Sequence, residues 1–207
     1  MPLWGTAHAA ATNKPKFLTT DEDSDYTRQD SYATQGGWAM RAGTKSQGND
    51  NTSADPEILV AIGDLAGSTD TTGLRAPTVT HMRFIKGTTA TTDLTAADST
   101  ARILVEITWD EAVTVVGSPT VVVANSNASG GGFGNYTLVY TATGSTANRK
   151  RFTLTSQSLG NTDVLTLGGS NISLNSGTIS DTAVGGTTLA ASLVLSGISA
   201  VAVTIAS

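Results

Sequence analysis

The chain lacks cysteine and carries few charged or aromatic residues. None of its 207 residues is cysteine, which excludes disulfide bonds and thiolate metal sites. Charged residues make up 14% and aromatic residues 5%, so a hydrophobic core must be built largely from valine, isoleucine, leucine and alanine. The net charge of -5 provides no general attraction to nucleic-acid phosphates. We therefore expect neither a disulfide scaffold nor a nucleic-acid partner.

Long apolar runs are lacking as well. The first residues contain no basic stretch followed by an apolar core, so the sequence predicts no signal peptide. The most apolar window, residues 189–206, is interrupted by serine, glycine and threonine. It falls short of the roughly 18 uninterrupted apolar residues that a membrane helix needs. We expect no membrane partner.

What the sequence has in quantity is glycine, with 22 residues, and β-branched side chains. The clearest pattern lies at 102–109, where apolar and polar residues alternate except at Leu104. This period of two predicts a half-buried strand. The apolar face of that strand would carry Ile103, Val105, Ile107 and Trp109, and the polar face Arg102, Glu106 and Thr108.

Similar runs recur at short intervals through residues 76–207, separated by turns rich in glycine, serine and asparagine. Such spacing predicts an antiparallel β-sandwich of Greek-key type. The expected strands are 78–85, 101–109, 113–116, 120–124, 136–143, 151–155, 164–167, 178–180, 192–195 and 200–205.

Residues 1–75 have a different character. They hold most of the charges in small scattered groups, and only the apolar run at 58–62 predicts a strand. Aromatic residues recur along this region between polar and glycine-rich spacers. Two interpretations are open: an extended N-terminal arm that places aromatic side chains in pockets on a partner, or a small β subdomain whose aromatics form its own core.

Part of the second region resembles a known family. The sequence WDEAVTVVGSPTV at 109–121 is similar to the "strand, E-A-V, G-x-P-x-V/L" signature of the bacterial Ig-like repeats of large surface adhesins. YTLVY at 136–140, LTL at 165–167 and SGTISD at 176–181 resemble the later strands and closing turn of that family. The chain departs from it in a glycine-rich insertion and in an apolar tail. The resemblance implies a mainly β protein: an arm or small β subdomain (1–75), then an Ig-like antiparallel β-sandwich (76–207).

The first region resembles a second family. MPLWGT at 1–6, followed by KPKFL at 14–18 and QGGW at 35–38, is similar to the start of small virion structural proteins in contractile-tailed phages of marine cyanobacteria. The two resemblances together imply a capsid decoration (cement) protein on the virion surface, not an enzyme. It would bind the major capsid protein through residues 1–75, in symmetric copies. The expected contact residues are Trp4, Lys14, Lys16, Phe17, Tyr26, Tyr32, Trp38 and Phe133.

A second function remains open, namely a tail-fibre or baseplate module whose sandwich loops bind host-surface glycan. Sugar rings usually stack on exposed tryptophan or tyrosine. Residues 76–207 offer Trp109, Tyr136 and Tyr140, and the alternation at 102–109 places Trp109 in the core. This scarcity of exposed aromatic rings disfavours the glycan-binding alternative.

No arrangement of residues predicts catalysis, a cofactor or a metal site. His8 and His81 are distant in sequence and have no neighbours at ligand spacing. A calcium site would need one end of the sandwich to gather several carboxylates, and no calcium-binding loop is present. We therefore interpret those carboxylates as turn and edge-strand charges. They are Asp110, Glu111, Asp163 and Asp181.

The basic run at 149–151 stands just before an expected strand. Edge strands commonly carry such charges because they block aggregation, and we prefer that interpretation. The alternative is contact with an acidic capsid surface.

Overall fold

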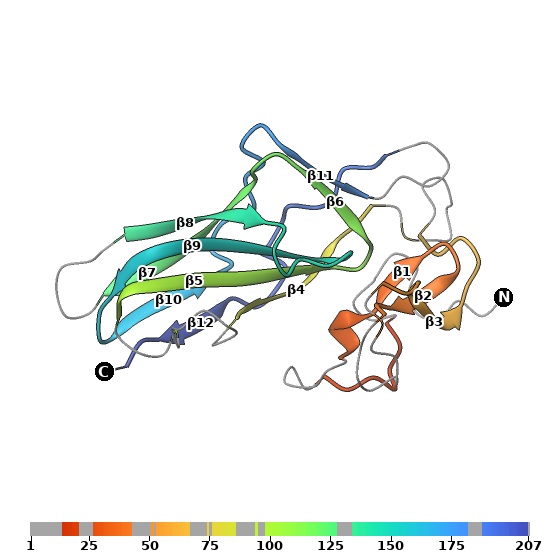
Figure 1. Cartoon of the computed structure of the whole chain (residues 1–207), viewed down its shortest axis with the longest axis horizontal. Coiled ribbons are helices and arrows are strands. Elements are labelled where there is room, and N and C mark those ends of the chain that lie inside the picture. The colour runs from red at the N-terminus through yellow and green to blue at the C-terminus, as the bar shows by residue number, and fades with distance from the viewer. Residues whose placement is uncertain are drawn as a thin grey trace.

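The computed structural model describes residues 14–20, 27–42, 51, 53–66, 74, 76–85, 94, 98–127, 134–181 and 188–206. Antiparallel strands dominate them, with one short 3₁₀-helix, η1 (Arg28–Asp30). The predicted mainly β fold is confirmed. A β-sandwich and a smaller sheet at one end of it make up the molecule (Figure 1).

The sandwich is built on one large sheet with the strand order β12-β10-β7-β8-β9-β5-β4. Consecutive strands β7, β8 and β9 pair side by side, and β10 returns to pair with β7. This is the Greek-key arrangement. The strands are β4 (Val79–Phe84), β5 (Asp98–Trp109), β7 (Thr120–Asn127), β8 (Gly134–Thr141), β9 (Arg149–Leu159), β10 (Asp163–Leu167) and β12 (Val201–Thr204).

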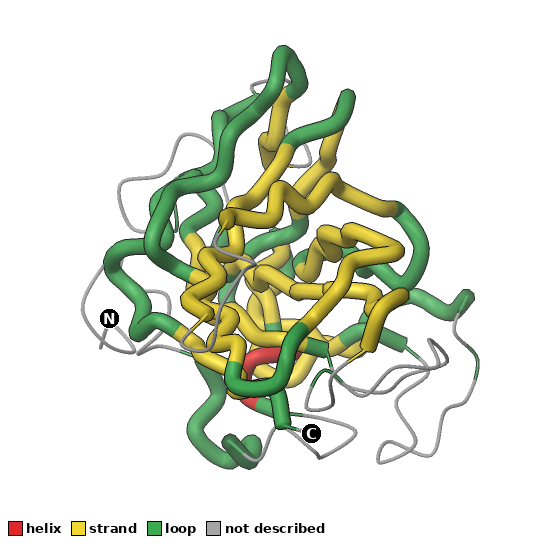
Figure 2. The backbone as a smooth tube through the Cα atoms, turned by 90° about the vertical axis from the view of Figure 1, so that its left-hand side faces the viewer, coloured by secondary structure: helices red, strands yellow, loops and turns green. Residues whose placement is uncertain are grey.

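The large sheet rolls up until its two edge strands, β4 and β12, contact each other. At this seam the Met82 side chain packs against Gly168, where any Cβ atom would collide with it. A separate pair, β6 (Val113–Val116) and β11 (Thr178–Asp181), lies over one side of the rolled sheet (Figure 1). Viewed end-on, the strands surround a common interior, and the architecture is intermediate between a sandwich and a barrel (Figure 2).

The interior is filled mainly by aliphatic side chains and by three large aromatic ones, Phe84, Trp109 and Phe152. The alternation predicted for 102–109 is correct for the inward face, because all four of its apolar residues are fully buried. The Trp109 indole N–H donates a hydrogen bond to the Ser192 carbonyl oxygen (3.1 Å), which satisfies its one polar group.

The described part of residues 1–75 forms a three-stranded antiparallel sheet, here called the N-terminal sheet. Its strands are β1 (Tyr32–Thr34), β2 (Gly37–Met40) and β3 (Glu57–Ala61), in that order. The sheet has a hydrophobic cluster separate from that of the sandwich, made by Ala33, Trp38 and Leu74 with Val60, Ile62, Leu65 and Ala66. The described part of residues 1–75 is therefore a small β subdomain, the second of the two interpretations, with Trp38 in its own core.

Several predicted strands differ from the observed ones. Residues 192–195 are extended but outside any strand, because their backbone groups bond individually to Pro77 and Ile172. Strands β1 and β2 were not predicted, since each is too short for a period to show. Strand β9 is longer than the expected 151–155 and continues to Leu159.

Gly37 provides a test of whether the N-terminal sheet depends on one close backbone approach. Its φ is +129°, and a Cβ atom there would collide with the Val60 carbonyl of the paired strand β3. We expect Gly37→Ala to destabilise the N-terminal sheet by at least about 2 kcal/mol. Hydrogen exchange at β1 and β2 measures this.

Gly36→Ala is the matched control. Its Cβ atom would meet only the end of the Ile58 side chain at 3.4 Å, so protection of β1 and β2 is expected to persist. Equal protection in both variants would show that the sheet does not depend on the close approach of β2 to β3 at Gly37.

Candidate functional site

The structure divides the eight predicted contact residues into three groups. Lys16 and Phe17 are exposed, and Phe17 is 70% exposed, the highest value among the large hydrophobic residues described. Lys14, Tyr32 and Trp38 are buried inside the chain itself, so their side chains are not presented to a partner. The other three, Trp4, Tyr26 and Phe133, lie outside the described residues.

Lys16 and Phe17 occupy a turn with buried residues on both sides. The Leu18 N–H donates to the Pro15 carbonyl oxygen (3.4 Å), which closes the turn. Leu18 is 4% exposed, and the buried Lys14 donates from Nζ to the Gln29 carbonyl oxygen (3.1 Å). The turn therefore projects Phe17 while both of its ends are anchored.

Arg28 holds the same turn from the side. Its Nη2 donates to the carbonyl oxygens of Lys16 (2.7 Å) and Leu18 (3.4 Å). Its own N–H donates to the Thr19 carbonyl oxygen (2.7 Å). With its carbonyls satisfied in this way, the turn is ordered before any partner binds.

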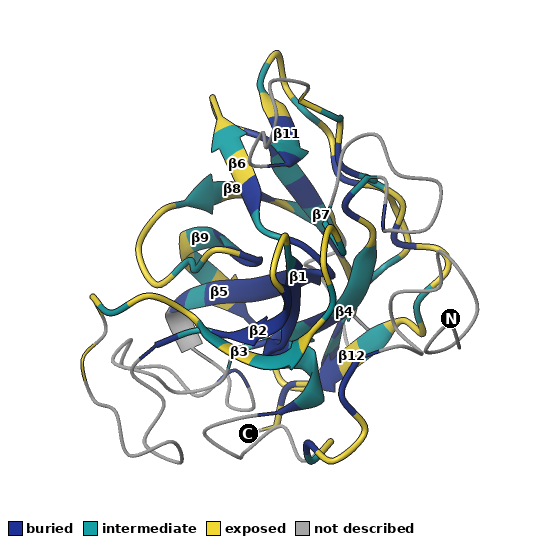
Figure 3. Cartoon of the chain, turned by 90° about the vertical axis from the view of Figure 1, so that its right-hand side faces the viewer, coloured by how far each residue is buried: buried dark blue, intermediate teal, exposed yellow. Residues whose placement is uncertain are grey.

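A polar junction joins the N-terminal sheet to the end of the sandwich (Figure 3). Arg149 Nη1 lies 2.6 Å from Asp30 Oδ1, and the Ala33 N–H donates to the Asp110 carbonyl oxygen (2.6 Å). Asp30 Oδ2 in turn accepts from the N–H (2.8 Å) and hydroxyl (3.2 Å) of Thr27, which fixes the carboxylate in place. This ion pair and this backbone hydrogen bond connect the described parts of the two units directly.

Glu106 on β5 is the centre of the charges behind this junction. Its carboxylate, fully buried, accepts from Arg83 Nη2 (2.9 Å) and Arg151 Nε (3.0 Å), and Arg149 Nη1 lies 3.4 Å away. Burial alone would raise the pKa of Glu106, but Arg149, Arg83 and Arg151 outweigh it and lower the pKa below its ordinary value.

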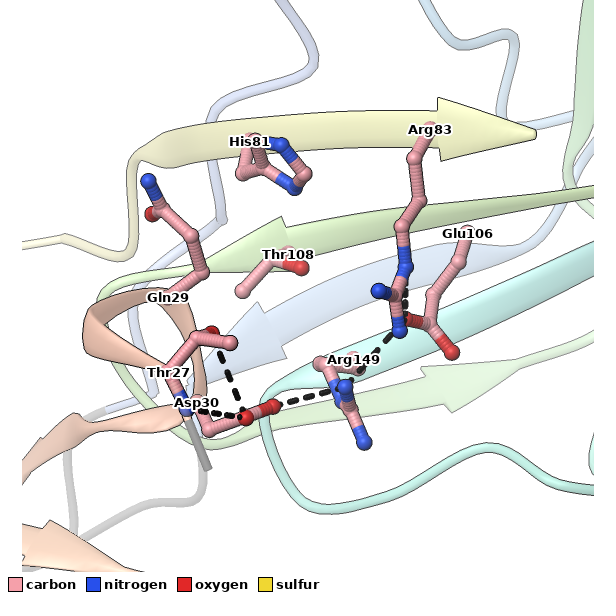
Figure 4. A pocket seen from close by; sticks show the side chains of 8 residues that line it. All are labelled: Thr27, Gln29, Asp30, His81, Arg83, Glu106, Thr108 and Arg149. Carbon is pink, nitrogen blue, oxygen red and sulfur yellow. Dashed lines mark hydrogen bonds and ion pairs between the residues drawn. The ribbon is translucent and has the colours of Figure 1, made fainter. Parts of the chain in front are cut away.

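Between the Glu106 cluster and the N-terminal sheet lies a cavity of about 10 Å³, enough for one water molecule. Figure 4 shows its lining side chains converging from both sides of the junction. Thr27, Gln29 and Asp30 come from the N-terminal unit, by which we mean the described part of residues 1–75. The sandwich contributes His81, Arg83, Glu106, Thr108 and Arg149. His81 of β4 thus lies at the junction. A cavity of this size is too small for an organic ligand.

Two sequence interpretations are corrected by this cluster. The polar face of β5 is not solvated, because Glu106 and Thr108 are at most 1% exposed beneath the arginines and the N-terminal unit. The basic run at 149–151 does not protect an edge strand, since β9 lies between β8 and β5. Arg149 and Lys150 are instead buried, and burial lowers the pKa of Lys150 to about 8.

The four carboxylates considered for calcium do not all gather at one end: Asp181 and Asp110 lie near Glu111, whereas Asp163 does not. Asp163 begins β10 opposite Asn127, at the far end of the sandwich from Asp110 and Glu111. Within the described ranges, no group of three or more histidine, aspartate or glutamate side chains is arranged to hold a metal ion. The Asp110 carboxylate accepts instead from the Thr78 N–H (2.6 Å) and hydroxyl (2.5 Å).

The two tyrosines considered for glycan stacking both make contacts within the chain. The Tyr136 hydroxyl donates to the Ser158 carbonyl oxygen (3.2 Å) and accepts from Asn125. Tyr140 packs edge-on against Phe152, with ring centroids 6.2 Å apart. Neither ring presents a fully open face for a sugar.

Comparison with protein-family models, with curated proteins and with solved structures finds no match to this chain. No helix among the described residues has the length and apolar character needed to cross a membrane.

Removing the Glu106 charge tests the buried cluster. Glu106→Gln leaves three arginines without their shared anion, so we expect a loss of about 3 kcal/mol in unfolding free energy at neutral pH, measured by denaturant titration. The pKa of Glu106 is lowered in the folded chain. Its contribution to the unfolding free energy is therefore fully present above pH 4.5 and is lost as the pH falls through the lowered pKa.

The variant is accordingly expected to show a weaker acid dependence than the native chain. Glu57→Gln on β3, where the side chain is partly exposed, is the matched control and is expected to change stability little. A Glu106→Gln variant as stable as the control would contradict the role assigned to the cluster.

Proposed function

We propose that this chain is a capsid decoration protein of a phage virion and that it binds the major capsid protein through the Lys16–Phe17 turn. The observation that carries the proposal is the exposure of Phe17 on an anchored turn. A large apolar side chain on a backbone that is already held in place loses less entropy on binding than one on a free segment, and such residues often dominate interfaces. Lys16 beside it favours an acidic rim around the partner's pocket.

The N-terminal unit would bind as a folded body rather than as an extended arm. Trp38 fills its core and Tyr32 is buried as well, so neither side chain is open to a partner unless the sheet unfolds. Ordering an extended segment would cost about 1–2 kcal/mol per residue, and a prefolded sheet avoids that cost. The sequence resemblance at 14–18 supports the same region, because KPKFL is the turn itself.

The alternative, a glycan-binding tail module, gains no support from Tyr136 or Tyr140. Both rings are partly buried and bonded within the sandwich. We therefore retain the capsid as the proposed location.

Copy number in purified virions tests the location. Quantitative mass spectrometry, with the major capsid protein as internal reference, is expected to find on the order of hundreds of copies in simple ratio to that protein. A few dozen copies or fewer would favour the tail. Absence from particles would overturn the assignment to the virion.

Phe17→Ala tests the contact itself. We expect the variant to keep the native unfolding free energy within about 0.5 kcal/mol, because Phe17 is 70% exposed. Its affinity for capsids that lack the protein is expected to fall by at least about tenfold, measured by sedimentation with particles.

Val116→Ala is the control, since Val116 is another exposed apolar residue (61%) on a different element, β6. It is expected to bind as the native chain does. Native affinity in Phe17→Ala would show that the turn is not the contact.

A further inference from the structure

Glu111 occupies an unusual place at the junction. It pairs with Ala33 of β1 in a parallel bridge, so the chain at Asp110 and Glu111 continues the N-terminal sheet into the sandwich. The residue is only 4% exposed, and its Oε1 is buried without a hydrogen-bond partner among the described residues. A carboxyl group in this position is costly to ionise.

The described bonds across the junction are a salt bridge and a backbone hydrogen bond. The two hydrophobic clusters are separate, so no continuous apolar core ties the N-terminal sheet to the sandwich. Units joined by polar interfaces of this kind move relative to one another unless specific bonds hold them. The specific bonds here are the Ala33–Asp110 hydrogen bond and the Arg149–Asp30 ion pair.

We infer that Glu111 acts as a pH-responsive catch: the N-terminal sheet is docked on the sandwich while the Glu111 carboxyl is neutral, and ionisation of this group releases it. This inference concerns the free chain and does not depend on the proposed function. It rests on the buried, unpartnered position of Glu111 at the point where the two sheets meet.

The charges around Glu111 determine the direction of the effect. Burial, together with Asp110 beside it and Asp181 on β11, raises the pKa of Glu111 to about 8. Release would remove burial by the N-terminal sheet, so the pKa of Glu111 would fall toward its ordinary value of 4.5, while Asp110 and Asp181 stay beside it on the sandwich. The docked state therefore binds more protons between these values, and docking weakens as the pH rises from about 4.5 to about 8, by at most about tenfold per pH unit.

The N-terminal side contributes two further titratable groups. Burial lowers the pKa of Lys14 to about 8, although Asp110 and Asp30 act to raise it. Lys14 therefore affects docking only above about pH 8, where loss of its proton in the docked state strengthens docking. Burial raises the pKa of Tyr32, which stays neutral throughout. The weakest docking is thus expected near pH 8.

The absence of cysteine permits a clean distance measurement. Nitroxide labels at Gln35→Cys on the β1–β2 turn and Thr143→Cys on the β8–β9 loop report across the junction, and both positions are exposed. Electron double resonance on the full chain is expected to show one short distance near pH 5.5 and a growing long-distance population toward pH 8. An unchanged distribution over this range would overturn the proposal.

Substitutions assign the effect to one residue. Glu111→Gln is expected to stay docked at pH 8, whereas Glu57→Gln and His81→Gln are expected to keep the native pH dependence. Persistence of the native response in Glu111→Gln, or its loss in His81→Gln, would overturn the assignment.

Asp181→Asn is a second variant that tests the same proposal if Glu111→Gln does not fold. Asparagine keeps the oxygen that accepts from the Leu189 N–H (2.9 Å) but removes a charge that raises the Glu111 pKa. The docked state then loses less stability when Glu111 ionises, so a smaller released population than in the native chain is expected at pH 8. A released population equal to that of the native chain would contradict the catch. Hydrogen exchange at the Ala33 amide, relative to the core amide of Ile107, measures the same release without labels.

Discussion

The buried carboxylate of Glu106 is the interaction on which the junction depends. A charge in the middle of β5 is tolerable only because Arg83, Arg149 and Arg151 reach it from the two neighbouring strands. Arg149 then has a second partner in Asp30, which brings the N-terminal unit to the same place. Three arginines around one carboxylate leave an excess of positive charge, and Asp30 offsets part of it, so the N-terminal unit is linked to Glu106 through Arg149.

The sequence predicted the inward face of β5 well and its outward face poorly, for a physical reason. Alternating apolar residues indicate burial in a core, and the four apolar residues of the inward face are all buried as expected. They are Ile103, Val105, Ile107 and Trp109. A charged residue in a strand indicates a solvent-exposed face only when no oppositely charged side chain packs over it. Glu106 and the run at 149–151 are neighbours across the β5–β9 ladder, a relation of register that single-sequence periodicity does not contain.

The same limit applies to the candidate site. Aromatic residues in a polar region indicate either anchors for a partner or a small core, and composition does not separate the two. Trp38 packs in the small core and Tyr32 is buried, whereas Phe17 is exposed. What distinguishes Phe17 is the support of its turn by Arg28, which a sequence shows only as one more scattered charge.

The seam between β4 and β12 has a consequence for crowded surfaces. Open strand edges invite pairing with other chains, and the risk grows with local concentration. With its two edge strands in contact, and with Met82 packed against Gly168, the large sheet presents less open edge to a neighbouring chain. Strand addition from a second chain is thereby disfavoured.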